Sequence, residues 1–126
     1  MKADIYSIGT ELLMGELTDS NASWIAARLP AYGIQVQGIT IIGDNIGLLS
    51  EGFVRGLSRS DIIFTTGGLG PTQDDLTREA IAETFGETPT VQIEVVEDLK
   101  RHFLTRGVTM PIANTKQAHL IPSAKF

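Results

Sequence analysis

One stretch of the sequence reads Asp61-Ile62-Ile63-Phe64-Thr65-Thr66-Gly67-Gly68-Leu69-Gly70-Pro71-Thr72-Gln73-Asp74-Asp75-Leu76-Thr77. Its first six residues are rich in β-branched and aromatic types, and their continuous apolar character predicts a strand that is buried on both faces of a sheet. Gly67 and Gly68 end this strand abruptly. Apolar residues recur at helical spacing from Leu76 onward, so the stretch predicts a strand, a glycine-rich loop and a helix in that order.

Strands and helices alternate along the rest of the chain. Apolar runs bounded by glycine or turn residues predict strands at 3–8, 34–42 and 61–66, and helical spacing predicts helices at 22–29, 46–57, 76–85 and 91–103. This order favours right-handed crossovers and a mainly parallel sheet with helices on both faces. The predicted fold class is therefore α/β. The pattern is weakest in residues 110–126.

Composition excludes several classes of function. The 126 residues suit one domain, and 42% of them are hydrophobic, which is enough to line a core. A net charge of −5 argues against nucleic-acid binding through phosphates. The chain has no cysteine, and its two histidines, His102 and His119, are too far apart in sequence for a histidine metal cage. Neither a signal peptide nor a membrane-spanning apolar run is present, so we expect a cytoplasmic protein with no membrane partner.

The glycine-rich loop has the composition of a phosphate site. Gly67, Gly68 and Gly70 allow backbone N–H groups to point into one concavity, next to the positive end of the following helix. The loop is not a Walker P-loop, since no Gly-Lys-Ser/Thr sequence follows it. It is not the dinucleotide-binding fingerprint either, since Gln73 stands where that fingerprint requires glycine. We therefore expect a small phosphorylated ligand in a site of another type.

Two interpretations of the acidic pair Asp74 and Asp75 remain open. Beside a phosphate, both carboxylates would repel the ligand unless a divalent cation such as Mg²⁺ or Mn²⁺ lay between them and the phosphate oxygens. Alternatively, Thr72 is the N-cap of a capping box and Asp75 stands at the third helical position, which would be a structural role.

Further acidic residues follow the other two predicted strands. Glu11 comes after the strand at 3–8, and Asp44 comes after the strand at 34–42. Because the carboxyl ends of parallel strands meet at one edge of a sheet, Glu11, Asp44 and Asp75 are predicted to converge in one acidic site. An alternative role for Asp44 is to cap the helix at 46–57.

Three spaced motifs resemble the amino-terminal domain of the CinA family. They are Gly9-Thr10-Glu11-Leu12-Leu13-Met14-Gly15 followed by Asp19-Ser20-Asn21, the loop from Thr65 to Thr77, and Asn114-Thr115-Lys116-Gln117-Ala118 with Ile121-Pro122. That domain is similar to the wider molybdopterin-binding superfamily, which includes MogA, MoaB and parts of MoeA and gephyrin. The resemblance implies a single three-layer α/β/α domain over residues 1–126 that is incomplete at its carboxy terminus. We also expect a homo-oligomer.

The resemblance also implies a set of site residues. Asp44, Asp74 and Asp75 would be catalytic, with Asp44 and Asp75 as the metal ligands. The residues expected to bind substrate are Gly9, Thr10, Glu11, Asn21, Thr66, Gly67, Gly68, Leu69, Gly70, Pro71, Thr77, Asn114 and Lys116.

The activity implied by the resemblance is metal-dependent hydrolysis of ADP-ribose, and the separate deamidase domain of CinA proteins is absent from this sequence. One alternative is a molybdopterin-binding or adenylyl-transfer domain of molybdenum cofactor biosynthesis. A second alternative is a noncatalytic binding or assembly module. Leu69 and Asp74 stand where MogA-like proteins have threonine and arginine, and this departure favours the CinA activity over pterin-phosphate binding.

Overall fold

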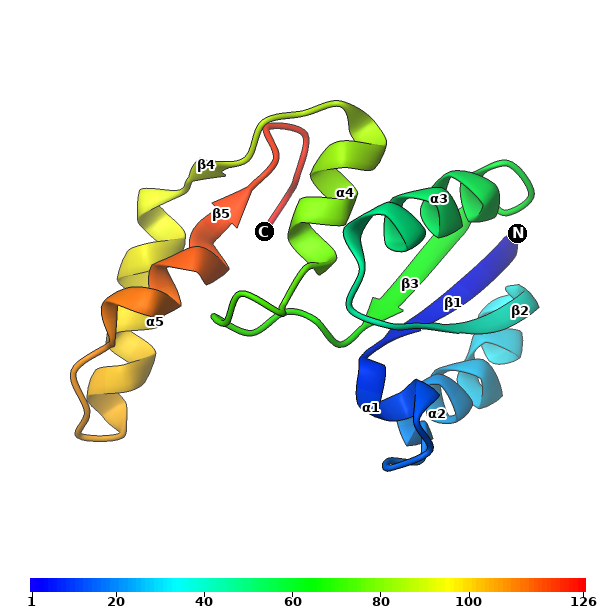
Figure 1. Cartoon of the computed structure of the whole chain (residues 1–126), viewed down its shortest axis with the longest axis horizontal. Coiled ribbons are helices and arrows are strands. Elements are labelled where there is room, and N and C mark those ends of the chain that lie inside the picture. Colours follow the sequence, from blue (N-terminus) through cyan, green and yellow to red (C-terminus); the bar gives the residue numbers. More distant parts are fainter.

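A computed structural model describes residues 1–126 as a main body with a smaller lobe beside it (Figure 1). The main body contains β1 (Lys2–Ile8), α1 (Thr10–Leu13), α2 (Ser20–Arg28), the 3-10 helix η1 (Leu29–Tyr32), β2 (Gln35–Ile42), α3 (Ile46–Leu57), β3 (Ile62–Thr66) and α4 (Thr77–Phe85). The carboxy-terminal lobe contains β4 (Thr90–Val91), α5 (Ile93–Thr105), the 3-10 helix η2 (Ile112–Ala118) and β5 (His119–Leu120).

The main sheet is parallel and has β1 at its centre. Its strand order is β2-β1-β3, with Ile5 opposite Ile39 on one side and opposite Phe64 on the other. Because the three strands run in the same direction, their carboxyl ends lie at one edge, beside α1 and the glycine-rich loop (Figure 1). The predicted α/β class with a parallel sheet is thus confirmed. The strands β4 and β5 form a separate antiparallel pair.

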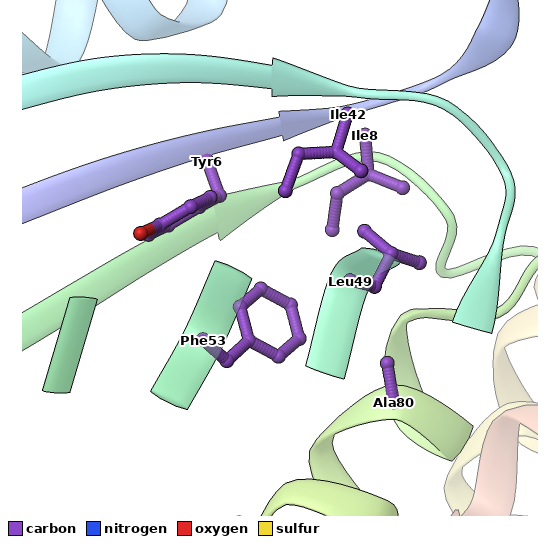
Figure 2. Packing of buried hydrophobic residues seen from close by; sticks show 6 residues of the cluster. All are labelled: Tyr6, Ile8, Ile42, Leu49, Phe53 and Ala80. Carbon is purple, nitrogen blue, oxygen red and sulfur yellow. The ribbon is translucent and has the colours of Figure 1, made fainter. Parts of the chain in front are cut away.

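Strand β1 contributes to two apolar cores because its successive side chains point to opposite faces of the sheet. On one face, Ala3 and Ile5 pack with Ala22 of α2 and Leu29 of η1. On the other face, β1 and β2 pack against α3 and α4. Helices therefore cover both faces of the sheet. Figure 2 shows the second cluster, which consists of Tyr6, Ile8, Ile42, Leu49, Phe53 and Ala80.

Two glycines allow α3 to approach the sheet closely. The Tyr6 hydroxyl donates a hydrogen bond of 2.8 Å to the carbonyl oxygen of Gly52, inside the helix. A Cβ atom at Gly56 would lie 2.7 Å from the same hydroxyl oxygen, closer than real contacts of this kind. Both glycines cost helix propensity, but larger residues would push α3 away from Tyr6.

A buried carboxylate lies within β1. The side chain of Asp4 is fully buried and accepts hydrogen bonds from the guanidinium of Arg59 and, at 2.6 Å, from the hydroxyl of Ser60. Burial raises the pKa of Asp4, but the hydrogen bonds from Arg59 and Ser60 and the charge of Arg59 outweigh burial and hold this pKa below its usual value. The pair ties β1 to the segment that connects α3 with β3.

The strand β3 differs from the prediction that it would be buried on both faces. All five of its residues are only partly buried, because β3 lies at an edge of the sheet and pairs with β1 alone. An apolar groove beside it is lined by Phe53, Leu57, Ile63, Thr65, Ile81 and Phe85.

The carboxy-terminal lobe includes residues 110–126, where the sequence pattern of apolar residues is weakest. The helix predicted at 91–103 begins at Ile93 and ends at Thr105, because Thr90 and Val91 pair with residues 119–120 instead. None of the residues of α5 is buried. None of the helices in the structure combines the length and apolar composition that crossing a bilayer requires.

Replacing Asp4 with Asn should lower the free energy of unfolding at neutral pH by about 1.5–3 kcal/mol, because the charge-assisted hydrogen bonds are lost and Arg59 is left without its partner. The folded-state pKa of Asp4 lies below the unfolded value of about 3.9. The wild type therefore has this stabilisation above that pH and loses it as the pH falls through the folded-state pKa.

Urea denaturation of the wild type and of Asp4→Asn between about pH 2 and pH 7 measures this difference. The exposed Asp74→Asn, whose carboxylate accepts no hydrogen bond from the protein, serves as the control. Stability curves that stay parallel across the acidic range would show that Asp4 is not the group that titrates.

Candidate functional site

The carbonyl groups of the glycine-rich loop are all held by the protein. Thr77 at the start of α4 donates from its hydroxyl to the oxygen of Gly67, at 2.8 Å, and from its N–H to the oxygen of Gly68, at 3.3 Å. The guanidinium of Arg78 donates to the carbonyl oxygens of Leu69, at 2.7 Å, and Gly70, at 2.6 Å. Four consecutive carbonyls thus point toward α4.

The N–H groups of Gly68 and Leu69 consequently point away from α4, because each shares a planar trans peptide with the held carbonyl of the residue before it. Those of Gly67, Gly68 and Leu69 have no hydrogen-bond acceptor in the protein. Gly67 and Gly68 both have positive φ values, 87° and 61°, a conformation that glycine adopts without strain. Successive free N–H groups can form an anion-binding concavity. This arrangement supports the predicted phosphate site, which stays a prediction.

The end of the loop is closed by its own carboxylate. Asp75 accepts hydrogen bonds from the N–H of Gly70, at 2.9 Å, and from the N–H and hydroxyl of Thr72, at 2.9 and 2.7 Å. The hydroxyl of Thr72 is the largest influence on the pKa of Asp75. Together with the two N–H bonds and the charge of Lys116, it outweighs burial and lowers this pKa. Pro71 has no N–H, and the N–H groups of Gly70 and Thr72 are bound to Asp75, so the free donors at the start of the loop are those of residues 67–69.

The capping-box interpretation predicted the hydrogen bond between Thr72 and Asp75 correctly, but it placed the start of the helix wrongly. Thr72 and Asp75 do bond to each other, but α4 begins at Thr77, and its N-cap residue Leu76 has no side-chain cap. Asp75 therefore stabilises the turn that precedes the helix. Asp74, its neighbour, is exposed.

Asp44 connects the loops that follow β1 and β2. One of its carboxylate oxygens accepts from the N–H of Thr10, at 3.0 Å, and from the Thr10 hydroxyl, at 2.9 Å. The alternative that Asp44 caps α3 is wrong, since Asn45 is the N-cap and accepts from the N–H of Leu48. Gly9, the residue before Thr10, donates its N–H to the carbonyl of Ile42 at 3.0 Å.

The acidic side chains do not converge as predicted. No three acidic or histidine side chains lie close enough together to hold a metal ion. Asp44 is held by Thr10, and Asp75 is held within its own loop. The expectation that Glu11, Asp44 and Asp75 form one acidic site is therefore wrong, because Asp44 and Asp75 are each bound to different partners in different loops.

A polar pocket lies beside the free N–H groups. Four residues predicted to bind substrate line it, namely Glu11, Asn21, Thr66 and Gly67. Asp19 also lines the pocket and was not among the predicted site residues. It caps α2 by accepting from the N–H of Ala22, at 3.0 Å, and it accepts from the hydroxyl of Ser7. Aspartate is a common N-cap residue, so the residue type at the start of α2 points to a helix start and not to a ligand site.

The predicted residues Asn114 and Lys116 lie on η2, and both bond to protein groups. Lys116 donates to the carbonyl oxygens of Thr72 and Asp75, at 2.6 Å each. Asn114 donates to the side chain of Gln117, which in turn donates to the carbonyl of Leu69. These contacts link the lobe to the glycine-rich loop.

Residues 4–123 match a family model described as "Probable molybdopterin binding domain". The chain belongs to this family. Similar proteins include a CinA-like protein from Deinococcus radiodurans, 50% identical over 98% of this chain, and one from Thermomicrobium roseum, 44% identical over 99% of it. The chain spans 30% and 31% of the lengths of these relatives.

Solved structures agree with the family and with the predicted resemblance to CinA. The protein CinA from Thermoplasma acidophilum superposes with a TM-score of 0.86 and 26% identity, covering 99% of this chain and 73% of that chain. The molybdopterin biosynthesis enzyme MoaB from Thermus thermophilus has a TM-score of 0.65 and 20% identity, covering 92% of this chain and 70% of that chain. The likeness to MoaB shows the fold alone.

Gly68→Ala should destabilise the domain more than Gly86→Ala. Both glycines have positive φ values near 60°, so both substitutions carry the backbone cost of about 1–2 kcal/mol. A Cβ at Gly68 would also overlap the hydroxyl of Thr77, whereas a Cβ at Gly86 meets nothing within 4 Å. We expect the free energy of unfolding to fall by about 1–3 kcal/mol more for Gly68→Ala, measured by urea denaturation. Equal losses would mean that Thr77 does not hold the loop tightly.

Asp75→Asn should also destabilise the protein, because an amide oxygen replaces a carboxylate that accepts three hydrogen bonds. The expected loss at neutral pH is about 1.5–3 kcal/mol, the range for hydrogen bonds to charged groups. The loss should shrink as the pH falls through the lowered pKa of Asp75, since the wild type is then protonated too. Thermal melts of Asp75→Asn and of the exposed control Asp74→Asn test this. Identical melting of the two variants at neutral pH would exclude a structural role for Asp75.

Proposed function

We propose that this domain binds the diphosphate of a nucleotide sugar at residues 67–69 and hydrolyses ADP-ribose. The observation that carries the proposal is the row of three N–H groups without a protein acceptor, at Gly67, Gly68 and Leu69. The N–H groups of Gly68 and Leu69 are fixed by the two hydrogen bonds from Thr77 to the carbonyls that precede them, so phosphate oxygens would meet donors that need no rearrangement.

The surroundings of these donors favour a nucleotide sugar over free phosphate. The adjoining pocket offers the carboxylates of Glu11 and Asp19 and the amide of Asn21. Carboxylate and amide oxygens accept hydrogen bonds from ribose hydroxyls. The exposed side chain of Leu69 adds an apolar surface that suits the face of a base or a sugar. A ligand with a diphosphate flanked by sugars uses all of these groups.

The donor set for the expected Mg²⁺ or Mn²⁺ is smaller than the sequence predicted. Asp75 already accepts three hydrogen bonds, so it is a poor metal ligand. Asp74 is exposed, and Asp44 uses only one carboxylate oxygen, toward Thr10. Mg²⁺ is commonly held by one or two carboxylates together with substrate phosphates, so Asp44, with one oxygen free, would hold the cation together with the diphosphate. When bound, it would neutralise phosphate charge and lower the pKa of a water molecule.

The chain's own groups would stabilise charge on the phosphate and orient the ligand. The N–H groups of residues 67–69 would stabilise the negative charge that develops on phosphoryl oxygens during attack by water. Glu11 would orient the sugar from the far side of the pocket. Asp75 would keep the loop in its binding conformation without contacting the reacting atoms.

A second candidate ligand is a pterin phosphate. The family description favours it, and the same N–H groups would bind its phosphate. Leu69 and Asp74 argue against it, because they replace a hydroxyl donor and a cation of the MogA-like pattern with an apolar side chain and an anion. A binding module without turnover would keep the phosphate site and lack the hydrolysis.

Incubation of the chain with ADP-ribose and Mg²⁺ or Mn²⁺ is expected to yield AMP and ribose phosphate, measured by chromatography. EDTA should abolish turnover. ATP with a pterin phosphate should give no adenylylated product. Gly68→Ala should lose turnover, and Gly86→Ala, whose substitution lies outside the glycine-rich loop, should keep it.

Three results would redirect the proposal. Adenylyl transfer to the pterin would favour the second candidate. Tight binding of ADP-ribose in calorimetry without products would leave a binding module. Turnover that persists in EDTA would show that the reaction needs no divalent cation. The Deinococcus radiodurans relative, assayed in parallel, shows whether the longer protein behaves as this chain does.

A further inference from the structure

The ammonium group of Lys116 is fully occupied by protein acceptors. It donates to the carbonyl oxygens of Thr72 and Asp75, at 2.6 Å each, and lies 3.1 Å from a carboxylate oxygen of Glu79. A lysine ammonium has three donors, so none remains for a ligand. The side chain of Lys116 is only 20% exposed. A direct role in binding phosphate is therefore not available to it in this conformation.

The contacts of Lys116 complete the fixation of the turn that ends the glycine-rich loop. The N–H of Thr72 is held by the Asp75 carboxylate, and the C=O of Thr72 is held by Lys116. The side chain of Asp75 is held by Gly70 and Thr72, and its C=O is held by Lys116. Each of these two loop residues is thus fixed at more than one point.

Glu79 helps to hold Lys116 in place. It lies on α4, and its second carboxylate oxygen is buried and has no hydrogen-bond partner. A carboxylate in that position depends on the nearby ammonium for compensation of its charge. The charge of Lys116 also lowers the pKa of Asp75. The three groups therefore form one electrostatic unit that joins η2, α4 and the loop.

We propose that Lys116 is a positioning residue through which the carboxy-terminal lobe sets the shape of the phosphate-binding loop. This inference rests on the proposed function for the identity of the ligand site. Lys116 belongs to η2, and η2 belongs to the lobe that also carries α5. The neighbouring Gln117 adds a hydrogen bond of 3.2 Å to the carbonyl of Leu69. A displacement of the lobe relative to α4 would break these contacts and release the loop.

The test compares Lys116→Met with Lys100→Met, a matched substitution at an exposed position of α5. Hydrogen exchange by NMR reports on the loop without any ligand. We expect exchange of the Gly70 and Thr72 amides to rise at least tenfold in Lys116→Met, with no change at the amide of Ile5 in β1. Lys100→Met should match the wild type at all three amides.

Binding is measured by calorimetry with inorganic pyrophosphate as the probe. Its affinity should fall at least fivefold in Lys116→Met and stay unchanged in Lys100→Met. Glu79→Gln keeps the size of the side chain and removes its charge, so it should raise exchange at the same two amides by a smaller factor. This variant keeps the inference testable if Lys116→Met does not fold.

Three outcomes decide between this inference and the proposed function or overturn the inference itself. If the wild type does not bind pyrophosphate, the phosphate site is wrong, and the exchange data alone decide whether Lys116 positions the loop. If Gly70 and Thr72 exchange at wild-type rates in both Lys116→Met and Glu79→Gln, Lys116 has no positioning role. Uniformly faster exchange, including at Ile5, would indicate a loss of global stability and would also overturn the proposal.

Discussion

The double hydrogen bond from Thr77 to two consecutive glycine carbonyls is the constraint on which the site depends. Thr77 is fully buried at the start of α4, so the loop is attached to an element that cannot shift without disturbing the core. With the oxygens of Gly67 and Gly68 fixed toward the helix, the peptide units have one orientation left, and their N–H groups face away from α4. The hydrogen bonds to the carbonyl oxygens thus set the orientation of the N–H groups that would bind a ligand.

The rest of the fold supplies the platform for this attachment. The alternation of β1 places one apolar cluster against α2 and another against α3 and α4, so the central strand is fixed from both faces. The ends of β1 and β2 are joined by the contact between Thr10 and Asp44. The site is consequently built on the ends of packed strands and on a helix start, with the lobe as its outer support.

The local sequence predicted helices and strands well where the spacing of apolar residues coincides with residues that begin or end an element. The helix expected at 46–57 agrees with α3 at both ends, because Asn45 caps it and the apolar stripe stops at Leu57. Long-range partners could not be predicted. Asp44 and Asn45 are both cap types, and only the contact of Asp44 with Thr10, 34 positions away, separates their roles. The ammonium of Lys116 donates a hydrogen bond to the carbonyl of Thr72, 44 positions earlier, and no local sequence pattern indicates this contact.

The central place of β1 has a consequence for how the chain acquires its fold during translation. The ribosome delivers β1 first, yet its two neighbours are residues 35–42 and 62–66. The sheet cannot be completed until residue 66 has left the exit tunnel. Until then a strand with high β-propensity has free edges that other nascent chains or chaperones can engage. Synthesis therefore runs ahead of folding in this domain, and the amino-terminal segment has to stay accessible while the strands that enclose it are made.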